Sequence, residues 1–426
     1  MKVNGLRWWI IGLIGLVTVI NYLDRSTLSI MWPSISHDLN MSTKDYALIL
    51  NIFMIAYGFG QSFSGKIFDK VGTRIGYVLT IGLWGISSFS HAFARSVLSF
   101  GFLRATLGLG EAGNWPGAVK SNAEWFPVKE RAIAQGIFNS GASLGSVVAP
   151  PLIATLWAAF GWKVTFMIVG SFAVTWLIPW LIINKALPDK HKWITEKEKE
   201  YILSGREKKE EEAKGLSFKE LLSHKESWAV LISRLFMDPI WWVFVGWMPI
   251  YLADVYGFNV KQIGYFAWVP YVGAAIGSIA GGAYAGNLIK KGKSINYARK
   301  KSIIVGAVLM FLGLLATIFY AHTALRFVLV VFVVLFGFQF AIGNVQTLPS
   351  DLFSGKSVGS LAGLGGTFAV FSVIIINFLV PVIASYSYVP IFILIALYVP
   401  LGVLAIFIFA PKIKLVDGEP VESNNK

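Results

Sequence analysis

The feature of this sequence that most constrains its fold is the repetition of apolar stretches about as long as a bilayer is thick. The hydrocarbon core requires about 20 consecutive, mostly apolar residues in a helix. Hydrophobic residues make up 55% of the chain and charged residues only 14%, against about 25% charged in soluble domains. We predict an all-α polytopic membrane protein with twelve spanning helices, at 8–30, 46–68, 75–94, 98–124, 131–159, 164–184, 228–252, 262–289, 301–320, 325–349, 358–384 and 388–410.

The predicted helices fall into two sets of six, which gives an N-terminal bundle (1–184) and a C-terminal bundle (228–410). Between them lies a linker, 185–227, with eleven basic and ten acidic residues, and a polar tail follows at 411–426. Inside the linker, Thr195 with Glu198 and Ser217 with Glu220 match the capping box that begins a helix. The linker is therefore predicted to carry short helices outside the membrane.

Loop charge predicts the orientation. Lys and Arg concentrate at the N-terminus, in alternate loops and in the tail, as expected for loops that stay in the cytoplasm. We expect both termini to be cytoplasmic, in the inner membrane of a bacterial cell. The first apolar run has no cleavage site after it, so we expect it to remain as a helix. The same loop pattern accounts for the net charge of +14 without nucleic-acid binding.

The two halves also resemble each other. "AEWFPVKERAIAQG" (123–136) aligns with "SDLFSGKSVGSLAG" (350–363), so that Glu124 pairs with Asp351 and Phe126 with Phe353. Each stretch joins the fourth predicted helix of its half to the fifth. Two parallel six-helix repeats form one known transporter architecture.

Ionisable residues inside the predicted spans are the main functional signal. Asn21, Asp24 and Arg25 share one face of the first helix, and Tyr22 extends a polar stripe around Arg25. On the fourth helix, Arg104 and Glu111 are two turns apart on one face, or about 10 Å along the axis. Charges are costly in a bilayer and usually line a water-filled path or pair with one another.

Two interpretations of these residues remain open. In the first, they form a purely structural network in which an acid neutralises an arginine. In the second, they form a substrate and ion site, because a guanidinium fork matches a carboxylate. Glycines at 108, 110 and 113 favour the second interpretation if they thin the fourth helix where a solute approaches.

The loop after the second helix, "GKIFDKVGTR" (65–74), matches the pattern G-x-x-x-D-K-x-G-x-R. Together with the helix count, it resembles the major facilitator superfamily, in which this loop is a latch on the inside face. The resemblance implies a gating role for four residues: Gly65, Asp69, Gly72 and Arg74. Asp69 is expected to pair with Arg74 or to face a helix N-terminus. In the second half Gly286 occupies the position of the acid, so a second latch is expected to be weaker or absent.

Two further stretches, "NYLDRSTLS" (21–29) and "EWFPVKERAIA" (124–134), resemble the anion:cation symporter branch of that superfamily. The chain is most similar to its bacterial hexuronate transporters. The resemblance implies that Arg25 binds the substrate carboxylate and Glu111 carries a proton. It makes Arg104 the regulating partner of Glu111, and Asp24 a second group that takes a proton. Ala142 departs from the galactonate transporters of the branch, which have Gln there.

A sugar acid also requires hydroxyl partners and an aromatic surface, and ordinary helix packing is the alternative for each candidate. The candidate substrate residues besides Arg25 are Tyr22, Tyr57, Asn139, Trp242, Gln339, Asn344 and Thr367. All five His residues lie in loops or near helix ends, so a buried histidine proton relay is not expected.

We therefore expect a monomeric, proton-coupled symporter that imports a sugar acid, above all a hexuronate, by alternating access and without a cofactor. The alternatives are a symporter for another organic anion (an aldonate, glucarate or an aromatic carboxylate) or a transporter-like sensor. No Walker loop or HExxH motif is present, so the sequence does not predict an enzyme. It does not decide between hexuronates, fix the proton stoichiometry or exclude Na⁺.

Overall fold

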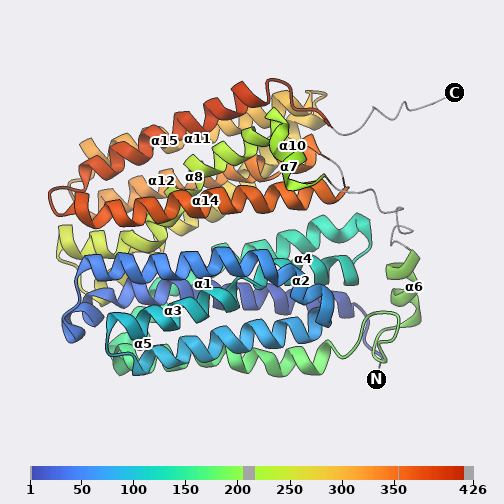
Figure 1. The fold of residues 1–426 in the computed structure, drawn as a ribbon, viewed down its shortest axis with the longest axis horizontal. Helices are drawn as coiled ribbons and strands as arrows, with labels where there is room; N and C mark the ends of the chain where they lie inside the picture. The colour runs from blue at the N-terminus through green and yellow to red at the C-terminus, as the bar shows by residue number, and fades with distance from the viewer. Residues whose placement is uncertain (1, 205–215, 354, 417–426) are drawn as a thin grey trace. The chain divides into compact units, whose positions relative to one another are not determined.

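The computed structural model describes residues 2–204, 216–353 and 355–416, and these are almost entirely helical (Figure 1). They form two compact units, Met1–Glu210 with Val245–Trp268, and Glu211–Phe244 with Val269–Lys426. The predicted tail lies outside the described residues from position 417 onward.

The first unit contains most of the N-terminal half of the chain. Its helices are α1 (Leu6–Leu39), α2 (Thr43–Ser90), the short 3-10 helix η1 (His91–Phe93), α3 (Val97–Glu111), α4 (Asn114–Trp125), α5 (Val128–Ile183), α6 (Glu196–Ser204) and α9 (Val260–Phe266). The second part of α8 (Lys225–Tyr256), from Val245 onward, also belongs to this unit. The sequence-based division places this segment in the C-terminal bundle.

Two of these helices each contain two spans. In α2 the backbone leaves helical geometry at Gly72 (φ 76°), and in α5 it does so at Gly161 (φ 73°). Positive φ is the region that glycine enters without a steric penalty, so each glycine turns the chain back across the bundle. Divided at these turns, α2 and α5 supply the second, third, fifth and sixth predicted helices.

The fourth predicted span is broken. It consists of α3, which ends at Glu111, and α4, which begins at Asn114. The glycines before the break pack against α2, since a Cβ on Gly108 would lie 2.6 Å from the Phe53 carbonyl oxygen and one on Gly110 2.8 Å from that of Thr80. The prediction that these glycines face a solute is therefore wrong; they allow two helix backbones to approach closely.

The second unit holds α7 (Phe218–Ser223), the first part of α8, α10 (Val269–Lys290), α11 (Ile295–Phe319), α12 (Ala324–Gln346), α13 (Leu348–Leu352), α14 (Gly355–Ala384) and α15 (Val389–Phe409). Its long helices α11, α12, α14 and α15 run nearly parallel or antiparallel to one another (Figure 1). Within the described residues, eight helices are long and apolar enough to cross a membrane, or nine if the bent pair within Thr43–Phe93 counts as one span.

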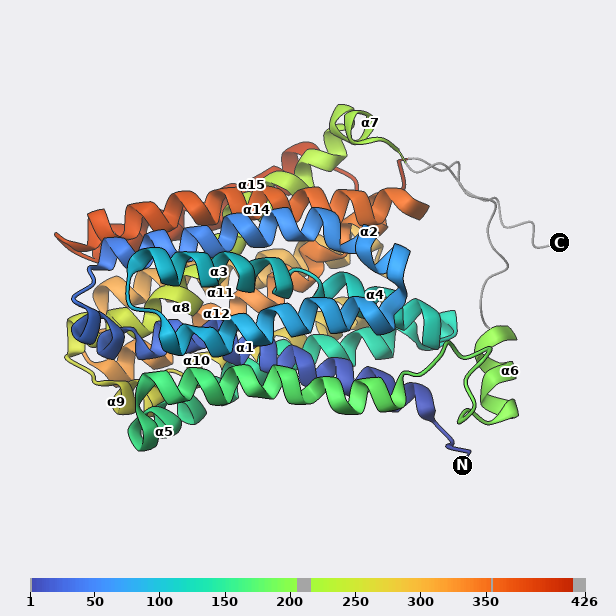
Figure 2. The same cartoon turned by 60° about the horizontal axis from the view of Figure 1, so that its bottom comes forward.

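The linker forms the two short helices that its capping boxes predict. In α7, Ser217 and Glu220 make the reciprocal capping box, and before α6 the Thr195 hydroxyl accepts from the Glu198 N–H at 3.3 Å. Helix α6 lies beside the N-terminal end of α1 (Figure 2). One part of the linker prediction, residues 205–215, lies outside the described residues.

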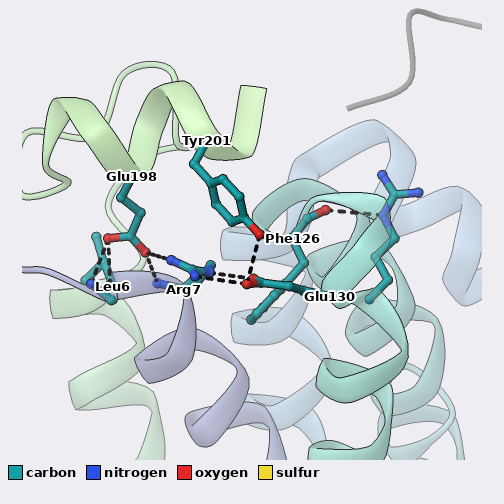
Figure 3. Close-up of polar contacts among 8 residues, drawn as sticks. Leu6, Arg7, Phe126, Glu130, Glu198 and Tyr201 are labelled. Atoms are coloured by element: carbon teal, nitrogen blue, oxygen red, sulfur yellow. Dashed lines mark hydrogen bonds and ion pairs between the residues drawn. The ribbon is translucent and has the colours of Figure 1, made fainter. Parts of the chain in front are cut away.

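Glu198 ties α6 to the first turn of α1, which Gly5 leaves without a side-chain cap. Its carboxylate accepts from the backbone N–H groups of Gly5 and Leu6 at 2.8 and 3.1 Å, and from the Arg7 guanidinium at 2.7 Å. Arg7 also donates to Glu130 at 2.8 Å, and the Tyr201 hydroxyl donates to Glu130 at 3.1 Å (Figure 3). A carboxylate at a helix N-terminus is favourable, so this helix of the linker stabilises the start of α1.

Candidate functional site

The centre of the candidate site is an ion pair between α1 and α3. The Arg25 Nε donates to the Glu111 Oε2 at 2.6 Å, and the two side chains are 4% and 0% exposed. Glu111 is the last residue of α3, directly before the break in the helix. The sequence placed both residues inside the bundle; Glu111 forms its hydrogen bond with Arg25, while its regulation by Arg104 stays a prediction.

Aromatic rings surround the Arg25 guanidinium. Its central carbon lies 4.7 Å from the ring centroid of Tyr57, 5.3 Å from that of Tyr22 and 5.9 Å from that of Phe53. Each ring face attracts a cation, and the Tyr57 hydroxyl also accepts from the Gln61 amide at 2.9 Å. The predicted substrate residues Tyr22 and Tyr57 are thus brought to Arg25, while Phe53 and Gln61 complete the set.

Asp24 and Arg104 form the second half of this cluster. The Asp24 carboxylate accepts from the Ser88 hydroxyl. Arg104 is buried, its charge interacts with those of Glu111 and Asp24, and its Nε and Nη2 have no hydrogen-bond partner among the described residues. Two arginines and two acids therefore balance in charge inside one unit, with Arg104 held by electrostatic attraction.

Polar groups missed by the sequence reasoning extend the cluster. The Asn114 amide, after the helix break, donates to the Thr18 hydroxyl at 3.2 Å. Asn114 was visible as a polar residue in mid-span, whereas nothing distinguishes Ser88 from other serines of an apolar helix. His91 is fully buried, with its ring stacked on that of Phe166 at 5.0 Å. Among the described residues, no group of three His, Asp or Glu side chains is placed to hold a metal ion.

The remaining candidate substrate residues differ in their exposure and in their hydrogen bonds. Asn139 is exposed and accepts from the Gln135 amide at 3.4 Å. In the second unit, Thr367 is exposed and Gln339 and Trp242 are half-buried. The Asn344 amide accepts from Arg299 at 3.2 Å and donates to the Phe340 carbonyl at 3.1 Å. Asn344 therefore bonds to an arginine of α11 in this structure, and its role as a substrate ligand stays a prediction.

The loop signature is only partly arranged as predicted. Gly72 has a positive φ of 76° and turns the chain, whereas a Cβ on Gly65 would meet nothing within 4 Å, so no helix packs closely against Gly65. Asp69 pairs with Lys120 at 2.7 Å, and Arg74 donates to the carbonyls of Lys185 and Leu181 at 2.7 and 3.3 Å. The sequence predicted that Asp69 pairs with Arg74 or faces a helix N-terminus. In the structure it forms an ion pair with Lys120 of α4 instead.

Each half holds an acid of the aligned repeat at the end of a short helix, just before a long one begins. In the first unit the Thr73 hydroxyl donates to Glu124 at 2.7 Å, and in the second Arg299 pairs with Asp351 at 2.8 Å. The second half therefore carries an ion pair of its own, built from residues outside the loop stretch 282–292 that contains Gly286.

The chain is similar to known transporters of one family. Residues 14–375 match the Major Facilitator Superfamily. The chain is 34% identical to the hexuronate transporter of Escherichia coli K12 over 95% of this chain and 94% of that protein. It is 36% identical to the galacturonate transporter of Dickeya chrysanthemi, over 72% of this chain and 90% of that protein.

A probable galactarate/D-glucarate transporter, GudP of Bacillus subtilis 168, is 31% identical over 91% of this chain and 88% of that protein. The crystal structure of a bacterial homolog of the human lysosomal transporter Spinster, inward-facing and unoccupied, superposes with a TM-score of 0.69 at 16% identity and covers 96% of each chain. The last likeness shows the fold alone. The chain belongs to the Major Facilitator Superfamily and is a multi-pass membrane transporter for a small organic anion, not an enzyme.

Proposed function

We propose that the protein is a proton-coupled symporter that imports a hexuronate, such as glucuronate or galacturonate, by alternating access. Two relatives that align over most of their length are named as transporters of these sugar acids. The observation that carries the mechanism is the buried pair of Arg25 and Glu111. We place the protein in the inner membrane with both termini in the cytoplasm, on the strength of the loop charges.

Arg25 is the group that binds the substrate carboxylate. A guanidinium fork matches a carboxylate in two parallel hydrogen bonds, and the rings of Tyr22 and Tyr57 beside it offer flat surfaces and hydroxyl groups to a sugar ring. In the state described here, the Glu111 carboxylate accepts the Arg25 Nε–H that such a substrate requires. Glu111 and the substrate carboxylate therefore compete for one cation.

This competition couples the proton to the substrate. A proton that binds to Glu111 neutralises the competing carboxylate and weakens its hold on Arg25, so that a carboxylate from solution can replace it. When the proton leaves on the other side, Glu111 becomes an anion again, pairs with Arg25 and displaces the substrate. Asp24, held by Ser88, and Arg104 keep the neighbouring charges balanced while this exchange occurs.

Another organic anion is the alternative substrate, because a probable galactarate/D-glucarate transporter aligns over most of its length. A dicarboxylate carries a second negative charge and needs a second cation. Among the described residues of the cluster around Arg25, that cation would be Arg104. Uptake of labelled glucuronate, galacturonate, glucarate and galactonate into proteoliposomes tests the proposal. Uptake of a hexuronate that depends on an inward proton gradient and not on Na⁺ supports it, and preference for glucarate or dependence on Na⁺ contradicts it.

A further inference from the structure

A second ion pair, between half-buried Arg234 and buried Asp238, lies in the membrane-spanning part of the second unit, where the proposed mechanism has no role for it. In α8 the Arg234 Nε and Nη2 donate to the Asp238 Oδ2 at 3.0 and 2.7 Å. The Arg234 Nη1 donates to the Ala362 carbonyl of α14 at 3.0 Å. The other oxygen, Asp238 Oδ1, is buried and has no hydrogen-bond partner among the described residues.

The surroundings of Asp238 hold little other charge. Arg234 is the charged group that acts on it, and residues 357–384 of α14 contain no ionisable side chain. From α15 the titratable residue is Tyr398, whose ring packs edge-on against Phe236 at 5.1 Å. From α10 it is Tyr271, whose ring lies 5.8 Å from that of Trp241. In the described residues of this unit, Asp238 is the only buried carboxylate.

We propose that Asp238 is a second proton-binding site of the transporter, with Arg234 as its fixed counter-charge. Asp238 takes up a proton on its unpartnered Oδ1 from the side with the higher proton concentration and releases it on the other side. No other bond forms or breaks. The inference rests on the proposed function, since it assigns a further coupled proton to the same transport reaction.

The geometry favours a proton site over a purely structural pair. A structural pair is stabilising when the remaining lone pairs are also satisfied, whereas here one carboxylate oxygen is buried with nothing to bond. A proton on that oxygen removes the negative charge that lacks solvation. Protonation of Asp238 also leaves Arg234 as an unbalanced cation in a medium of low dielectric constant. That charge attracts an anion such as the substrate. Protonation and anion binding therefore support each other.

The test measures accumulation at equilibrium in proteoliposomes with the membrane potential held at zero. Each coupled proton multiplies the accumulation ratio of a monovalent anion by about ten per unit of pH gradient, because one pH unit and a tenfold concentration ratio are the same free energy. We expect Asp238→Asn to lower the ratio of labelled glucuronate about tenfold per pH unit. Counterflow exchange, which requires no net proton movement, should persist, and Asp238→Glu should restore the ratio.

Asp351→Asn is the matched control, because it also removes an Asp paired with an Arg in the second unit. It is expected to change the rate of uptake but not the ratio. If Asp238→Asn does not fold, the double variant Arg234→Met with Asp238→Leu replaces the pair by apolar side chains and is measured instead. A ratio unchanged from wild type in a variant that exchanges substrate overturns the inference while leaving the proposed function intact. Failure of the wild-type protein to accumulate glucuronate at all overturns the proposed function.

Discussion

Replacing Glu111 by glutamine should remove the part of the pH dependence of substrate binding that Glu111 contributes. In the wild-type protein the substrate carboxylate and the ionised Glu111 compete for the Arg25 Nε–H, which Glu111 holds at 2.6 Å. Binding is then strongest at low pH, where Glu111 carries a proton, and weakens as the pH rises and the competitor ionises. A glutamine side chain mimics the protonated acid at every pH, so the Kd of Glu111→Gln should rise less steeply with pH than that of the wild-type protein.

The magnitude of this part follows from the one proton that Glu111 exchanges per substrate bound. Above the pH at which Glu111 ionises, Kd of the wild-type protein should rise about tenfold per pH unit, or about 1.4 kcal/mol. In the absence of substrate, Glu111→Gln leaves Arg25 with less compensation for its charge. Removing one partner of a buried pair lowers the free energy of unfolding by roughly 3–5 kcal/mol. The glutamine carbonyl can still accept a hydrogen bond from Arg25, so the loss in this variant should be smaller. Substrate should therefore raise the Tm of the variant more than that of the wild-type protein.

The assay is calorimetric titration of detergent-solubilised protein with glucuronate at a series of pH values one unit apart, alongside thermal unfolding with and without substrate. Glu130→Gln is the control, because Glu130 also pairs with an arginine, Arg7 at 2.8 Å, but in a partly exposed cluster. Its Kd should follow the wild-type pH dependence. An equal rise of Kd with pH in Glu111→Gln and wild type would refute the competition for Arg25.

Three further predictions follow from other parts of the structure. Arg25→Lys keeps the charge but loses the bidentate fork, so it should fold and lose most glucuronate binding; near-normal affinity by calorimetry would exclude Arg25 as the carboxylate ligand. Glu198→Ala removes the cap of α1 and should destabilise the protein by roughly 1–2 kcal/mol in thermal unfolding, whereas its exposed neighbour Lys197→Ala should not. Single cysteines in this cysteine-free chain should react with an impermeant thiol reagent in intact cells at 35–45 and 254–260 but not at 69–74, 127–131 and 290–301, and the reverse pattern would overturn the topology.

Helix ranges and linker helices were predictable because they depend on local signals. Apolar length alone located the spans, and the capping boxes at Thr195 and Ser217 located α6 and α7. The break between Glu111 and Asn114 was not predictable, since the glycines before it are equally compatible with a solute or with a neighbouring helix. Only the packed structure decides between these.

The members of the site were found more readily than their partners. Asp24, Arg25, Arg104 and Glu111 stand out because charge is rare inside an apolar span. Which arginine meets Glu111 depends on the tilt and rotation of α1 against α3, on which a linear sequence carries no direct information. Asn344 shows a related ambiguity: a polar residue in mid-span signals either a ligand or a helix–helix bond, and here it bonds to Arg299.

The central claim is that Glu111 carries a coupled proton by competing for the cation that binds substrate. The most direct test compares counterflow with gradient-driven accumulation of glucuronate by Glu111→Gln in the same proteoliposomes, at zero membrane potential. We predict that counterflow persists, because Arg25 can still bind the carboxylate, and that the accumulation ratio falls about tenfold per pH unit because one proton is no longer coupled. A ratio equal to that of the wild-type protein would contradict the claim and make Asp24 the first alternative carrier. A parallel loss of counterflow and accumulation would assign Glu111 a structural role instead.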